Sequence, residues 1–119
     1  MKQQFIVRAM EEAQRSDQNF KHGALLVKNR KIISQGHNRT TTKCPSHMFS
    51  IHAEIAAIKQ FSEKINIQNS HIYVVRINNQ SSLADSKPCY NCQHFMKLHG
   101  ISRVFYSTGK ENEFNNLYI

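Results

Sequence analysis

The segment SIHAEIAA, residues Ser50–Ala57, is the stretch around which this chain is organised. It supplies a histidine of the kind that binds metals, His52, and a carboxylate two residues later, Glu54. Apolar residues then recur at helical spacing, at Ile51, Ile55, Ile58 and Phe61. We therefore expect a helix here that is capped by Ser50 and has His52 near its start.

A second motif, PCYNC, occupies residues 88–92 and opens another helical pattern that ends near Gly100. Residues three apart lie on one face of a helix, so Cys89 and Cys92 can point at one ion. A helix start also favours negatively charged thiolates. With His52 they make three zinc ligands, which leaves a fourth position for water, as catalytic zinc sites require.

The combination of His-x-Glu with Pro-Cys-x-x-Cys is typical of zinc-dependent nucleobase deaminases. On these residues the chain resembles the cytidine and deoxycytidylate deaminase superfamily over most of its length. The resemblance implies a zinc cofactor and hydrolysis of a carbon–nitrogen bond in a cyclic amidine. It also makes Glu54 the catalytic residue, which carries a proton from the zinc-activated water to the ring nitrogen and the leaving amine.

The same resemblance suggests which residues contact the substrate. Asn38 would contact the sugar or base, and the backbone of Ala53 and Pro88 would line the pocket. Arg39 is a candidate partner for a phosphate, and His22 for stacking on or hydrogen bonding to the base. Each of these three polar side chains also has an ordinary interpretation, namely a turn-forming asparagine, a solvated arginine and a surface histidine.

Other interpretations of the cysteines stay open at this point. Cys89 and Cys92 could form a thioredoxin-type redox pair. Cys44 could be a fourth ligand that closes the zinc site and makes it structural. Alternatively, Cys44 and His47 could begin a second metal site.

The remaining elements predict an α/β fold. We expect two strands, 23–28 and 31–36, joined through a turn at Asn29, and a polar loop over 40–50. The other expected elements are a helix over 2–15, strands over 71–76 and 103–107, a helix over 89–99, and a short edge strand or helical turn in the tail, 109–119. A helix links the last two long strands, so they should be parallel. This pattern predicts one domain over residues 1–119, a three-layer α/β/α sandwich with a mixed sheet of four to five strands, as in cytidine deaminases.

The composition of the chain limits the classes of binding partner that we expect. Sixteen basic residues against eight acidic ones give the 119-residue chain a net charge of +8, which favours anionic partners such as nucleotides or nucleic acid. Three cysteines suit a reducing compartment, and no apolar run reaches the length of a membrane span. We expect a soluble cytoplasmic protein that does not bind membranes. An open sheet edge also predicts a homo-oligomer.

The choice among deaminase branches rests on single residues. PCYNC looks most like deoxycytidylate deaminases, whereas Gly36-His37-Asn38-Arg39 is close to the Gly-Trp-Asn-Arg of tRNA-adenosine deaminases. The basic residues are scattered and do not alternate with aromatics along a groove, as nucleic-acid binders often show. We therefore expect a small-molecule cytosine nucleotide or nucleoside as substrate. Single-stranded nucleic acid or tRNA is the alternative, and a non-catalytic zinc-holding protein is the third hypothesis, which an intact Glu54 disfavours.

Overall fold

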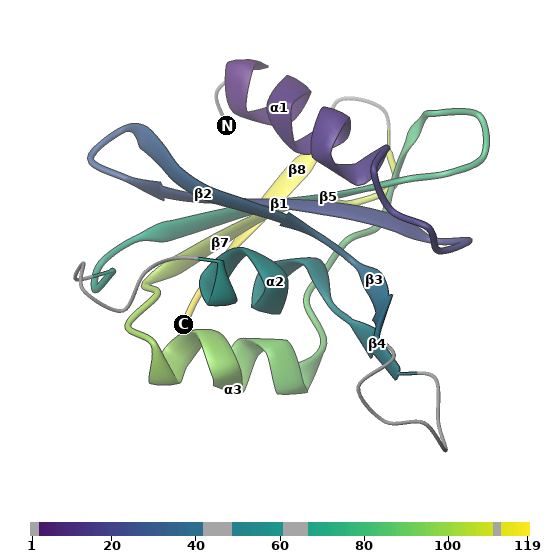
Figure 1. Cartoon of the computed structure of the whole chain (residues 1–119). Coiled ribbons are helices and arrows are strands. Elements are labelled where there is room, and N and C mark those ends of the chain that lie inside the picture. The colour runs from purple at the N-terminus through teal and green to yellow at the C-terminus, as the bar shows by residue number, and fades with distance from the viewer. Residues whose placement is uncertain (1–2, 42–48, 61–66, 111–112) are drawn as a thin grey trace.

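The computed structural model describes residues 3–41, 49–60, 67–110 and 113–119 (Figure 1). The elements follow in chain order: α1 (Gln3–Ala13), β1 (Lys21–Lys28), β2 (Lys31–His37), β3 (Arg39–Thr41), β4 (Phe49–Ile51), α2 (Ala53–Lys59), β5 (His71–Ile77), β6 (Leu83–Ala84), α3 (Tyr90–Leu98), β7 (Arg103–Ser107) and β8 (Phe114–Tyr118). The predicted hairpin forms through Asn29 and Arg30, which both have positive φ, as a tight two-residue turn requires.

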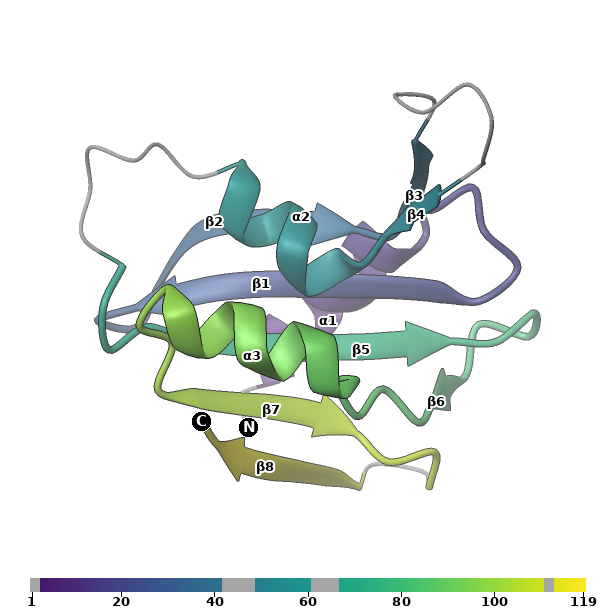
Figure 2. The same cartoon turned by 90° about the horizontal axis from the view of Figure 1, so that it is seen from below.

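The central sheet is mixed, as predicted. Its strands lie in the order β2-β1-β5-β7-β8, and the short β6 pairs with β5 (Figure 2). β5 and β7 are parallel, with α3 between them in the chain, whereas β1 runs antiparallel to both β2 and β5. The tail supplies the fifth strand of the row, β8, which lies antiparallel to β7 at the edge.

Helices cover both faces of this sheet, which confirms the α/β/α layering (Figure 1). Alternate residues of a strand point to opposite faces. Along β1, Ala24 and Leu26 pack with α2 and α3, whereas Leu25 and Val27 pack with Phe5 of α1. The central strands are therefore buried on both sides, and the helices have fixed positions relative to the strand ends.

Two glycines allow the helices to lie unusually close to the sheet. A Cβ atom on Gly36 of β2 would lie 2.8 Å from the carbonyl carbon of Ala56 and 2.9 Å from the carbonyl oxygen of Ala53, both in α2. A Cβ on Gly23 of β1 would lie 2.6 Å from the backbone nitrogen of Ala13 in α1. No side chain larger than hydrogen fits at either contact without movement of the helix.

Three local predictions need correction. Ser50 does not begin the helix, because it lies in β4, and α2 begins at Ala53 with His52 as its N-cap residue. Ile51 likewise belongs to β4 and not to the helix. The predicted loop over 40–50 includes the ends of β3 and β4, which pair with each other. Cys44, His47 and Phe61 lie outside the described residues.

Candidate active site

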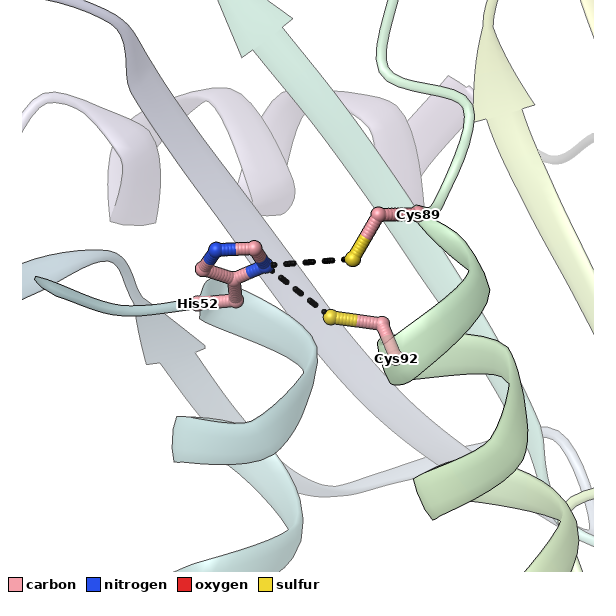
Figure 3. A group of neighbouring side chains, drawn as sticks. All are labelled: His52, Cys89 and Cys92. Atoms are coloured by element: carbon pink, nitrogen blue, oxygen red, sulfur yellow. Dashed lines mark hydrogen bonds between the residues drawn. The ribbon is translucent and has the colours of Figure 1, made fainter.

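The three predicted metal ligands converge from the starts of two helices (Figure 3). His52 and Cys89 are the N-cap residues of α2 and α3, and Cys92 lies in the first turn of α3. The Nδ1 atom of His52 lies 3.0 Å from Sγ of Cys92 and 3.6 Å from Sγ of Cys89, and all three ligand atoms fall within 4.8 Å of one another. One ion can therefore contact all three.

The position of Cys89 depends on two buried serines that contact each other, Ser86 just before it in the chain and Ser107 at the end of β7. The Ser86 hydroxyl accepts the backbone N–H of Ser107 at 2.8 Å and lies 2.9 Å from the carbonyl oxygen of Val74, to which it donates. The Ser107 hydroxyl donates to the carbonyl oxygen of Ala84 at 2.6 Å. These bonds tie the segment before Pro88 to the middle of β5 and to the last residue of β7. The first turn of α3 therefore starts from a fixed point beside α2.

Glu54 is buried next to this cluster, with 4 % of its surface exposed. Burial raises the pKa of its carboxyl group, and its own backbone N–H, the charge of His52 and a hydrogen bond with Cys92 partly oppose that rise. Burial also raises the pKa of the Cys92 thiol, and the neighbouring Glu54 charge adds to the rise. A buried thiol beside a buried carboxyl group has an environment that a cation would stabilise.

The donor set fits zinc. One imidazole nitrogen and two thiol sulfurs are the ligands that zinc accepts most readily, and three protein ligands are typical of catalytic zinc sites. Among the described residues, no other histidine, cysteine or carboxylate joins these three as a fourth ligand. Glu54 is a neighbour of the cluster and not a member of it.

A pocket of about 390 Å³ opens directly onto the cluster. It is lined by Gln18, Asn19, Phe20, His22, Asn38, His52, Ala53, Glu54, Ser86, Lys87, Pro88 and Cys89. Burial lowers the pKa of His22, opposed by a hydrogen bond with the Phe20 backbone and assisted by the charges of Arg76 and His52. His22 is therefore a neutral ring at neutral pH, able to donate and to accept hydrogen bonds.

Asn38 lines this pocket, but both polar atoms of its side chain already have protein partners. Its Nδ2 donates to the carbonyl oxygen of Phe20 at 2.6 Å, and its Oδ1 accepts the backbone N–H of His22 at 2.8 Å. Asn38 therefore holds the Phe20–His22 segment against the pocket. One N–H and one lone pair of the amide remain for a ligand, so its contact with a sugar or base stays a prediction.

The other predicted contact residues have different surroundings. Ala53 and Pro88 line the pocket, as expected, although the Pro88 carbonyl oxygen accepts the side-chain N–H of Gln93 at 2.9 Å. Arg39 is exposed on β3 and is not among the residues that line the pocket.

The sequence did not single out Gln18, Asn19, Phe20 or Ser86 as residues of the site, although all of them line the pocket. Phe20 was detectable as an isolated aromatic residue after the polar stretch Ser16–Asn19, but Ser86 carries no local signal.

A model of the cytidine and deoxycytidylate deaminase zinc-binding region matches residues 1–108. The chain therefore belongs to the cytidine and deoxycytidylate deaminase family. A search of curated proteins found no match. Of the described helices, none combines the length and apolar character needed to cross a bilayer.

Solved structures support the same fold. Cytidine deaminase from Burkholderia pseudomallei is 20% identical with a TM-score of 0.73, and the match covers 99% of this chain and 93% of that one. The dCMP deaminase of cyanophage S-TIM5, in complex with dCMP and dUMP, is 22% identical with a TM-score of 0.61, over 89% and 82% of the two chains. Its apo form is 25% identical with a TM-score of 0.60, over 89% and 84%. At such low identity these similarities concern the fold.

Proposed function

We propose that this protein is a zinc-dependent hydrolytic deaminase that converts a cytosine nucleotide or nucleoside, of the dCMP or CMP type, to its uracil form and releases ammonia. The observation that carries the proposal is the meeting of His52, Cys89 and Cys92 beside buried Glu54, at the end of a pocket. These side chains come from distant parts of the sequence. Ordinary packing gives no reason for all four to gather at one cavity.

His52, Cys89 and Cys92 would hold the zinc ion, which when bound supplies Lewis-acid activation of a water molecule. Glu54 would take the proton of that water, because its carboxylate lies beside the cluster without being part of it. The carbon–oxygen bond forms at the ring carbon that bears the amine. Glu54 would pass this first proton to the ring nitrogen. It would then take the remaining proton from the new C–OH group and give it to the amine, so that the carbonyl forms, the carbon–nitrogen bond breaks and ammonia leaves.

The burial of Glu54 suits this proton transfer. A buried carboxyl group beside the cluster is kept away from bulk water, so it can exchange protons with the bound water and the base within one cycle. Ala53 and the neutral ring of His22 would lie along the pocket walls, where they exclude water from the base and offer it hydrogen bonds.

Support for a cytosine nucleotide comes from the charge of +8 and from the similarity to a phage enzyme described with dCMP and dUMP. The test is ammonia release by the zinc-loaded protein. The panel contains dCMP, CMP, deoxycytidine, cytidine, adenosine, and cytosine- or adenine-containing single-stranded oligonucleotides and tRNA. We expect turnover of cytosine mononucleotides or nucleosides. Turnover confined to the oligonucleotides or tRNA would favour polynucleotide deamination, and turnover of nothing on the panel would contradict the proposal.

A further inference from the structure

Arg76 lies directly behind one wall of the proposed active-site pocket. It stands opposite His22 in the antiparallel register of β5 and β1. Its guanidinium carbon lies 4.5 Å from the centroid of the Phe20 ring, which is close enough for a cation–π contact. Arg76 is not itself a lining residue, but His22 and Phe20 both line the pocket, so the positive charge of Arg76 lies immediately behind that wall. After burial, this charge also helps to lower the pKa of His22.

The charge of Arg76 has no anionic partner within the described residues. Its Nε is buried and has no hydrogen-bond partner there, and no described carboxylate lies within ion-pair distance of its guanidinium group. Asp85 is the nearby acid that also influences His22, but its carboxylate accepts the backbone N–H of Lys87 at 3.2 Å. A buried arginine donor without a partner is rare in native proteins, and the fork of an arginine matches the oxygens of a phosphate.

A second cation reaches the same pocket from another segment. Lys87 is an exposed lining residue that precedes Pro88 and Cys89. A nucleotide whose base lies against Glu54 extends its sugar and phosphate away from the base, along the remaining lining residues, which include Phe20, His22 and Lys87. A phosphate there would be attracted by both Arg76 and Lys87, whereas a nucleoside has no anionic group that could pair with either side chain.

We propose that Arg76, assisted by Lys87, makes this pocket selective for cytosine nucleoside monophosphates over the phosphate-free nucleosides. Arg76 is then a specificity-determining residue that binds the substrate phosphate, while Glu54 and the three ligands act on the base. This inference rests on the proposed function, since it assumes that the pocket next to His52 is the substrate site.

The direct test measures binding of the reaction product, which needs no turnover. Calorimetry on the zinc-loaded protein would compare dUMP with deoxyuridine for wild type, Arg76→Gln and Arg76→Lys. We expect wild type to bind dUMP more tightly, and Arg76→Gln to weaken dUMP binding about 10- to 100-fold, as expected for loss of charge-assisted hydrogen bonds. The affinity for deoxyuridine should change less than about twofold. Arg76→Lys keeps the charge but not the forked guanidinium group, so its affinity for dUMP should lie between those of wild type and Arg76→Gln.

The matched control is Arg8→Gln, which removes one positive charge from an exposed position on α1, where Arg8 donates a hydrogen bond to Gln35. It should leave both affinities unchanged. Circular dichroism and the melting temperature of each variant establish that it is folded. Equal binding of dUMP and deoxyuridine by wild type, or equal weakening of both ligands by Arg76→Gln, would overturn the inference.

Kinetics separate this inference from the proposed function. Turnover of deoxycytidine as efficient as that of dCMP would remove the phosphate selectivity and leave the deaminase activity standing. Absence of turnover for every substrate, with dUMP still bound through Arg76, would remove the proposed reaction and leave the phosphate site. If Arg76→Gln lowers the turnover of a short cytosine-containing oligonucleotide but not that of dCMP, Arg76 binds the phosphodiester of a strand, and the assignment to a free nucleotide is wrong.

Discussion

Replacement of Gly36 by alanine tests how the sheet positions the candidate site. A Cβ atom at Gly36 would lie 2.8 Å from the carbonyl carbon of Ala56, 2.9 Å from the carbonyl oxygen of Ala53, and closer still to the backbone nitrogen of Ala57. Ordinary contacts begin near 3.4 Å. All three atoms belong to the backbone of α2, so no side chain can rotate away. The helix must retreat by roughly half an ångström or more, which exceeds the tolerance of a catalytic site.

The expected effects follow from that displacement. Overpacking should lower the free energy of unfolding by about 1–3 kcal/mol, or roughly 5–15 °C in melting temperature. Because α2 carries Glu54 and begins next to His52, zinc affinity should weaken measurably. Turnover should fall roughly 10- to 100-fold. The assays are thermal unfolding, competition for zinc with a chelator, and ammonia release.

Gly23→Ala is the matched control, because it introduces the same methyl group on the other face of the sheet. There the Cβ would meet the backbone of Ala13 at 2.6 Å and that of Ala9 still more closely, so α1 and not α2 must move. We expect a similar loss of stability with a smaller loss of zinc affinity. If both variants lose stability equally and neither changes zinc affinity or turnover, the reasoning that Gly36 sets the position of the site is refuted.

Three further predictions concern single side chains. Glu54→Gln should keep zinc at one ion per chain but lower turnover at least about 100-fold, measured by metal analysis and ammonia release; full activity would exclude Glu54 as the proton carrier. Ser86→Ala should lower the free energy of unfolding in urea by about 1–3 kcal/mol, because the buried N–H of Ser107 loses its partner. It should also weaken zinc binding. An unchanged free energy of unfolding would contradict the structural role given to the Ser86 hydroxyl. Burial and Arg103 lower the pKa of His71 in the folded protein, so the unfolded chain binds more protons just below pH 6.5 and the unfolding free energy should fall as the pH drops there. His71→Gln should reduce that pH dependence, and an identical slope would show that His71 does not contribute.

The parts of the fold that were predictable are those with a local signal. The turn at Asn29 and the alternating apolar residues of the flanking strands identify the hairpin without tertiary information. The spacing of Cys89 and Cys92 likewise determines that both lie in one helical turn, so their meeting with His52 followed once both helix starts were placed at one end of the sheet.

The predictions from the sequence were wrong or incomplete where contacts between distant segments determine the local structure. Ser50 is a good N-cap residue by type, but pairing between β3 and β4 draws it into a strand and leaves His52 at the cap. Nothing in the sequence around Ser86 predicts a hydroxyl that bonds both to the middle of β5 and to the end of β7. Asn38 is a third case, because its amide binds the backbone on either side of Lys21, a contact that depends on how the end of β2 lies beside the start of β1.

The central claim is that His52, Cys89 and Cys92 hold one zinc ion and leave a position for water. X-ray absorption spectroscopy of the zinc-loaded protein measures this directly. We expect two sulfur ligands at about 2.3 Å and two lighter ligands near 2.0–2.1 Å, one from the imidazole and one from water, with an identical spectrum for Cys44→Ser. Three sulfur ligands in the wild type, reduced to two by Cys44→Ser, would mean a closed structural site and would contradict the catalytic account.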